Sequence, residues 1–227
     1  MEPLLLFVIA AAVISIIAIV SYFFSNKQVI KRTLIKIPHK PIGSLKTNEF
    51  TKINGKALHV TEPLIAPLSQ RKCIFYTIKI QEKWSNGNST YWKTLVNETM
   101  IQDFFIENNG DYAIVKPVKH PKNYISHLVV DKKTSSGTFN EPTPKFQSLL
   151  KRYDISSTNF FGWNKSLRYT EAIIEIGEHI TVAGIAKWKS LSEPIPEYPY
   201  SKIVALESTS KQKIIITDVP LENVRNR

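Results

Sequence analysis

Apolar residues form one unbroken run at the N-terminus of the chain. Residues 3–24 include no charged side chain. At about 1.5 Å per residue this run makes a helix of roughly 33 Å, which is enough to cross a hydrocarbon core of about 30 Å. The run is apolar on every side, whereas a helix lying on a soluble core has one polar face. The pattern therefore predicts that residues 1–24 form one transmembrane helix.

A cleaved signal peptide is the competing interpretation of this segment. Its apolar region would normally span about 7–15 residues, follow a positively charged start and end at a small-x-small cleavage site. Here the run is longer, no Lys or Arg precedes it, and no such cleavage site follows it. We therefore expect an uncleaved signal anchor.

The charges that flank the apolar run predict its orientation. Only Met1 and Glu2 precede the run, and neither is basic. Basic residues near a span favour the cytosolic side, so we expect the N-terminus outside and the rest of the chain in the cytosol. With this topology the glycosylation sequons at Asn88, Asn97 and Asn164 are chance matches. The basic residues that follow the run are Lys27, Lys31, Arg32, Lys36 and Lys40.

Residues 25–46 show no clean periodicity and contain Pro38 and Pro41, so we expect a semi-extended basic connector. Two interpretations of its charges stay open. The five basic side chains could contact anionic lipid, at about 1 kcal/mol each near the surface. Alternatively they only fix the topology.

Beyond residue 57 the apolar positions mostly alternate with a period of two, which is typical of β-strands. Asn86-Gly87 and Asn109-Gly110 separate strand-like segments and predict two hairpins. We expect a mainly antiparallel β fold, of barrel or sandwich type, with one or two short helices. The predicted strands are residues 57–61, 73–84, 91–99, 103–106, 112–118, 168–176, 179–188, 203–208 and 213–219.

One segment has helical spacing instead. Residues 144–153 carry Phe146, Leu149, Leu150 and Tyr153 on one face, and Thr143 followed by Pro144 is a typical helix start. Residues 131–143 are predicted to form a loop, and the proline-rich residues 193–199 are predicted to interrupt the strand pattern. We expect a β domain over 47–190 and a C-terminal strand pair, within 191–227, that packs on the same domain.

The charge balance narrows the classes of partner. The chain has 30 Lys and Arg against 19 Asp and Glu, for a net charge of +11. A basic surface favours anionic lipid, nucleic acid or acidic proteins. The basic residues are dispersed over many segments, and a membrane tether favours lipid or protein contacts. We therefore expect the lipid bilayer and a protein partner, and we do not expect nucleic acid.

The single cysteine, Cys73, excludes an internal disulfide and a Cys-rich zinc site. A nucleophilic role would need a base, for which His59, His120, His127 and His179 are the candidates. Cys73 lies within an apolar strand pattern, so a buried structural thiol is the simpler interpretation. The chain has no glycine-rich phosphate loop and no nucleophile elbow. We expect no catalytic residue, no metal site and no cofactor.

Three segments in order carry a resemblance to a known family. They are PLSQRKCIFY at 67–76 leading into Ile80-Gln81-Glu82, DFFIE at 103–107 with AIVKP at 113–117, and RYTEAII at 168–174 with GEHITVAGIA at 177–186. Over about residues 55–190 the chain resembles the GIDE domain, also called the "beside a membrane" (BAM) domain. This domain occurs in MAPL-type membrane-anchored E3 ubiquitin ligases and in prokaryotic membrane proteins. The motif residues, for which we expect structural roles, are Pro67, Leu68, Ser69, Cys73, Tyr76, Tyr169, Glu171, Gly177 and Gly184.

The resemblance implies a domain that lies near the bilayer and holds a partner or substrate. In the ligases a RING zinc domain follows, and a RING needs eight Cys or His ligands. One Cys and five His cannot supply them, so we expect no ligase activity of the chain's own. The leading hypothesis is a membrane-tethered binding or scaffold module that positions a protein partner at the cytosolic face. The alternatives are a RING-less component of a ubiquitin-like conjugation pathway and an anionic-lipid sensor.

Overall fold

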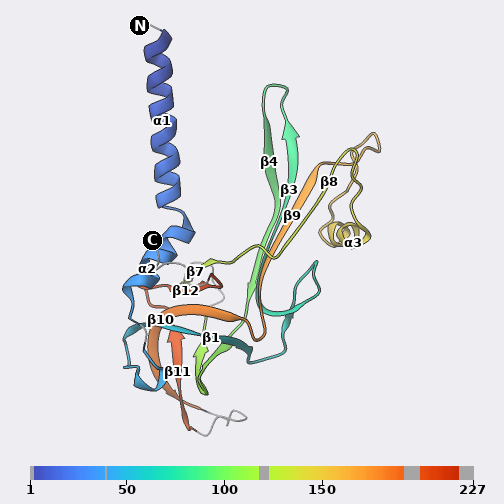
Figure 1. Cartoon of the computed structure of the whole chain (residues 1–227). Coiled ribbons are helices and arrows are strands. Elements are labelled where there is room, and N and C mark those ends of the chain that lie inside the picture. The colour runs from blue at the N-terminus through green and yellow to red at the C-terminus, as the bar shows by residue number, and fades with distance from the viewer. Residues whose placement is uncertain (1–2, 39, 118–122, 192–199, 220–227) are drawn as a thin grey trace.

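The computed structural model describes residues 3–38, 40–117, 123–191 and 200–219 (Figure 1). The fold is mainly β, as the sequence predicts. Its helical elements are α1 (Pro3–Phe23), α2 (Asn26–Lys36), η1 (Ile42–Ser44) and α3 (Pro144–Arg152). Its strands are β1 (Phe50–His59), β2 (Leu64–Ile65), β3 (Lys72–Ser85), β4 (Thr90–Ile101), β5 (Phe104–Asn108), β6 (Asp111–Val115), β7 (Tyr124–His127), β8 (Lys132–Ser136), β9 (Leu167–Glu175), β10 (His179–Ser190), β11 (Lys202–Glu207) and β12 (Ile214–Thr217).

The first sheet closes on itself and is called the barrel below. Its strand order is β1-β5-β6-β11-β10-β12-β7, and β1 also pairs with β10. The strands β1, β5, β6, β11 and β10 therefore form a closed ring, with β12 and β7 as an extension. Most pairs are antiparallel, but β6–β11 and β7–β12 are parallel. Apolar side chains of these strands fill the interior, among them Ile53, Phe104, Val182 and Leu206.

The second sheet, called the arm sheet below, has the order β2-β3-β9-β8, and β4 pairs with β3. The long strands β3 and β4 project away from the barrel on the same side as α1 (Figure 1). One face of the arm sheet packs against α3, with Phe146, Leu149 and Leu150 buried beside Tyr169 and Ile173. This second core places α3 over the sheet.

The predictions made from local signals are confirmed. Antiparallel pairing joins β3 to β4 around Asn86-Gly87, and β5 to β6 around Asn109-Gly110. Asn109 and Gly110 have φ of 54° and 85°, the left-handed geometry that such a tight turn requires. The helix at 144–152 begins as expected, because the Thr143 hydroxyl accepts a hydrogen bond from the Phe146 N–H at 3.3 Å.

The chain crosses from the arm sheet to the barrel at Gly177. The strands β9 and β10 follow each other in sequence but belong to different sheets. Gly177 has φ of 84°, as a glycine allows, and its N–H donates to the Ala57 carbonyl at 2.7 Å. The expected C-terminal strands are β11 and β12, which both pair with β10. The predicted proline-rich break at 193–199 lies outside the described residues.

Two predictions about the β region are wrong. Residues 131–143 are not all loop, since Lys132–Ser136 forms β8 and pairs with β9 at the end of the sheet. An edge strand of polar residues has no apolar alternation to reveal it. The predicted strand 57–61 begins earlier, at Phe50 in β1. At Gly55 a side chain could not fit, because an added Cβ would lie 2.1 Å from the Glu107 carbonyl oxygen of β5.

The semi-extended connector predicted at 25–46 is replaced by helix α2 over half of its length. Ile30 and Leu34, four residues apart, lie on one face of α2 and are buried with Ile37 against Ala183 and Ile215 of the barrel. The dense basic residues obscured this helical spacing in the sequence. Tertiary packing on the barrel supplies the stability that the isolated segment would lack.

The N-terminal helices differ from one straight span. Among the described residues, no single helix is both long and apolar enough to qualify as a membrane span. Residues Phe7–Phe23 together with α2 do qualify by length and composition, as a pair bent by 48°.

Candidate binding cleft

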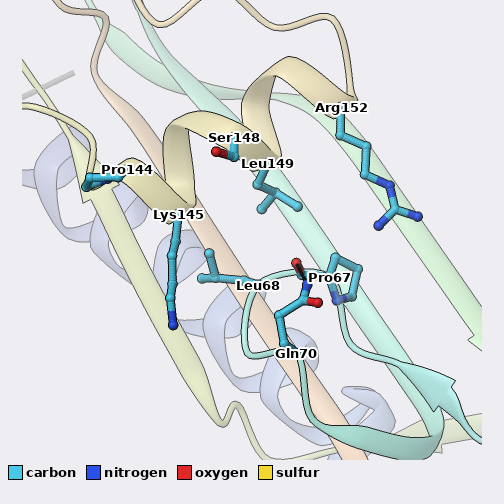
Figure 2. A pocket seen from close by; sticks show the side chains of 8 residues that line it. All are labelled: Pro67, Leu68, Gln70, Pro144, Lys145, Ser148, Leu149 and Arg152. Carbon is cyan, nitrogen blue, oxygen red and sulfur yellow. Dashed lines mark hydrogen bonds between the residues drawn. The ribbon is translucent and has the colours of Figure 1, made fainter.

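A cleft runs between α3 and the turn that joins β2 to β3, residues 66–71. It consists of two adjoining hollows of about 430 and 820 Å³. The two hollows share Leu68, Pro144 and Lys145 among their lining residues. Figure 2 shows the smaller hollow, with α3 on one side and the turn on the other.

The α3 wall is a regular helical stripe. Lys145, Ser148, Leu149 and Arg152 line the cleft at positions i, i+3, i+4 and i+7 (Figure 2). This spacing puts all four on one face of a helix. Leu149 is 4% exposed and lies at the bottom of the cleft, whereas the other three are exposed.

The turn wall is held by a buried carboxylate. Glu171 on β9 is 0% exposed and accepts hydrogen bonds from the backbone N–H groups of Leu68 at 2.9 Å and Ser69 at 3.1 Å. It accepts a third from the Tyr169 hydroxyl at 2.7 Å. Gln70 has φ of 58°, and its side-chain amide donates to the Pro67 carbonyl at 2.8 Å. These bonds fix the turn before any ligand arrives.

A second carboxylate fixes the end of α3. Glu98 on β4 accepts hydrogen bonds from the hydroxyls of Tyr76 at 2.6 Å and Tyr153 at 3.0 Å. Burial, and then the hydrogen bond to Glu98, raise the pKa of Tyr153 to about 12. Burial, reinforced by the hydrogen bond to Glu171, also raises the pKa of Tyr169 far above its ordinary value. Both tyrosines therefore stay neutral donors at physiological pH, and both walls of the cleft are tied to the arm sheet.

The rim of the cleft is basic. Arg71 forms ion pairs with Glu175 and, at 3.4 Å, with Asp131, so its charge is balanced. The remaining basic residues of the rim are exposed, and no ion pair to them occurs among the described residues. They are Lys132 and Lys133 on β8 and Lys145 and Arg152 on α3.

The thiol of Cys73 is buried and has a structural role. Its side chain is 0% exposed, and the Sγ–H donates to the Leu64 carbonyl at 3.6 Å. Burial, with the negative charges of Glu171 and Glu175 adding to it, raises the pKa of Cys73 to about 11. The group is therefore a thiol and not a nucleophilic thiolate at physiological pH. His120, a candidate base, lies outside the described residues.

Metal binding finds no support in the described part of the chain. No group of three or more His, Cys, Asp or Glu side chains there is arranged to hold an ion. The cleft thus combines walls fixed by hydrogen bonds, an apolar bottom and a positively charged rim. These features suit the binding of a ligand.

The structure gathers most of the motif residues around the cleft. Pro67, Leu68 and Ser69 form its turn, and Tyr169 and Glu171 hold that turn. Cys73 and Tyr76 lie on β3 beside them, whereas the two motif glycines lie elsewhere. Gly177 makes the crossing between the sheets, and Gly184 on β10 approaches β11, where an added Cβ would lie 3.4 Å from the Glu207 carbonyl oxygen.

Sequence reasoning missed the four cationic residues of the cleft rim. The spacing of Lys145 and Arg152 on the predicted helix was a signal that could have found the α3 pair. No such signal marked Lys132 and Lys133, because their segment was predicted to be a loop.

The basic residues expected at the membrane surface lie mainly on α2. Lys27 and Lys36 are exposed there, and Lys31 is half-buried. The Arg32 guanidinium donates to the carbonyls of Phe23 and Gln28. Lys40 follows the helix and forms an ion pair with Glu49.

Comparison with known proteins identifies no relative of this chain. No family model matches the sequence, and no curated protein or solved structure is similar enough to count as a match.

Proposed function

We propose that this protein is a membrane-tethered binding module that holds an acidic segment of a protein partner in the cleft between α3 and the turn at residues 66–71. The observation that carries the proposal is the combination of a basic rim with walls fixed in advance by Glu171 and Glu98. A preorganised site loses little conformational entropy on binding.

The chemistry of the lining favours an acidic peptide with apolar side chains between its charges. Leu68 and Leu149 offer apolar contact at the bottom, and Lys145 and Arg152 stand two helical turns apart on the rim. Carboxylates of a bound segment could reach both cations, and Arg152 suits bidentate contact. Lys132 and Lys133 extend the same positive potential along the larger hollow.

The membrane part of the proposal rests on the N-terminal segment. Residues 3–24 are uncharged and apolar, and basic residues follow them, which favours a cytosolic domain. The resemblance to the GIDE domain supports the same location. A tether of this kind raises the effective concentration of the cleft for partners at the same membrane.

The proposal is tested with full-length protein in nanodiscs of neutral lipid and a fluorescent hexaglutamate peptide as the probe. We expect Lys145→Gln with Arg152→Gln to weaken binding by about tenfold, since two charge pairs at the rim of the cleft are lost. Binding should also weaken as salt rises.

The matched control is Lys56→Gln with Lys79→Gln, which removes the same charge from exposed positions on β1 and β3. This pair should leave the affinity within about twofold, because it lies outside the cleft lining. Equal losses from both double variants would show that only net charge matters and would overturn the cleft as the site.

A further inference from the structure

A separate hollow of about 540 Å³ lies between α2 and the start of β1. Its lining comes from α2, from Ile37 just after it and from Phe50 at the start of β1. The α2 residues that line it are Val29, Arg32, Thr33 and Lys36. They recur at i, i+3, i+4 and i+7 and thus form one face of the helix. This face is a different one from the buried face that carries Ile30 and Leu34.

Arg32 brings positive charge to the end of the apolar helix. Its Nη2 donates to the Phe23 carbonyl, in the last turn of α1, and its Nε donates to the Gln28 carbonyl at 3.2 Å. The guanidinium carbon lies 6.0 Å from the centre of the Phe23 ring. The guanidinium therefore sits where the apolar run ends. In an anchored chain this level is the headgroup layer of the bilayer.

The lining of the hollow combines cationic and apolar side chains. Arg32 and Lys36 present cations, while Val29, Ile37 and Phe50 present apolar surface. A guanidinium has five N–H donors in a fork that matches a phosphate. The described bonds of Arg32 use two of them, which leaves donors for a further acceptor. A phospholipid combines a phosphate with hydrocarbon and so matches both kinds of lining side chain.

We infer that this hollow binds one anionic phospholipid, with the headgroup phosphate on Arg32 and Lys36 and apolar contact from Val29, the apolar lining residue nearest α1 in sequence. The inference rests on the proposed membrane attachment. A net negative lipid is favoured over a zwitterionic one, because Lys31 and Lys27 add positive charge on the same helix and would repel a choline group. The bound lipid would fix how the β domain sits against the bilayer.

The test is native mass spectrometry of the detergent-solubilised full-length protein with an equimolar mixture of phosphatidylglycerol and phosphatidylcholine. We expect one phosphatidylglycerol to be retained, in about fivefold excess over phosphatidylcholine. Arg32→Gln with Lys36→Gln should abolish this preference. Lys36→Gln alone, which leaves the Arg32 bond to the Phe23 carbonyl of α1 intact, should reduce it, so the result does not depend on the double variant folding.

Three outcomes would overturn the lipid site. The preference for phosphatidylglycerol could survive in Lys36→Gln and in the double variant. Alternatively, it could fall equally in the control variant Lys56→Gln with Lys79→Gln. Displacement of the lipid by millimolar inorganic phosphate or glycerophosphate would show that the ligand is a free anion.

The anchor is checked separately by alkaline carbonate extraction of membranes. Protein that pellets but shows no phosphatidylglycerol preference contradicts the lipid site alone, and protein released to the supernatant contradicts the membrane attachment.

Discussion

Single residues with buried charge determine how the cleft is built. Glu171 joins β9 to the turn at residues 66–71 by accepting two backbone N–H groups and one hydroxyl. A fully buried carboxylate is tolerated only when such donors surround it. The turn cannot move away without leaving this charge unsatisfied, so Glu171 is a positioning residue for the cleft.

Glu171→Ala is predicted to lower the free energy of unfolding by about 3 kcal/mol, since three buried donors lose their acceptor. Thermal unfolding of the detergent-solubilised protein, followed by circular dichroism, measures this loss. Glu141→Ala, which removes an exposed carboxylate just before α3, is the control and should change little. Equal melting temperatures for the two variants would contradict the anchoring role.

A half-buried carboxylate, Asp218, predicts a pH dependence. Asp218 follows β12 and accepts the Val129 N–H at 3.0 and 2.9 Å with its two oxygens. Burial raises its pKa from 3.8 to about 6, and the charge of Asp131 adds to the rise. Between these values the folded state keeps a proton that the unfolded chain has lost, so this group's contribution to stability falls as pH rises toward 6.

Asp218→Asn keeps an acceptor for Val129 but cannot ionise. The melting temperature of the variant relative to the unmodified protein should therefore rise between pH 5 and pH 7. Comparing the two proteins at each pH cancels the titration of all other groups. A difference that is constant with pH would show that Asp218 does not titrate in this range.

Helices and strands that depend on neighbouring residues could be predicted from the sequence. Those that depend on contacts with distant segments could not. The Asn-Gly hairpins and the capped helix α3 depend on neighbouring residues, and the structure confirms them. The helix α2 is stabilised by packing on Ala183 and Ile215, far along the chain, and β8 by pairing with β9. The cleft escaped prediction for the same reason, because its two walls come from distant segments.

The packing of α2 on the barrel predicts an effect at this scale. Leu34 is 0% exposed, so Leu34→Ala should cost about 3 kcal/mol of stability through lost burial and a cavity. Ile35, its exposed neighbour on the same helix, is the matched control, and Ile35→Ala should cost far less. Thermal unfolding measures both, and hydrogen exchange of α2 shows whether the helix loosens. A larger loss for Ile35→Ala would mean that α2 packs by its other face.

For the whole molecule, the proposed function requires the β domain to lie on the cytosolic side of a membrane. The β3–β4 hairpin carries Asn88 in its exposed loop, within a glycosylation sequon. A cytosolic domain never meets the glycosylating enzymes. Full-length protein made with endoplasmic-reticulum membranes is therefore predicted to stay unglycosylated, while an acceptor tag added at the N-terminus is modified. A glycan on Asn88 would show that the β domain lies on the lumenal side, opposite to the predicted topology.

The most direct test of the cleft is site-specific photo-cross-linking in intact membranes, from Ser148 inside the cleft and from Asn97, an exposed residue of β4, as the control. We predict that Ser148 captures one near-stoichiometric partner with an acidic segment and that Asn97 does not. This capture should be lost when Lys145 and Arg152 become Gln. A conjugating enzyme captured in that way would make the conjugation-pathway alternative the better account. The same products from both positions, or products indifferent to the loss of Lys145 and Arg152, would contradict the cleft as the binding site.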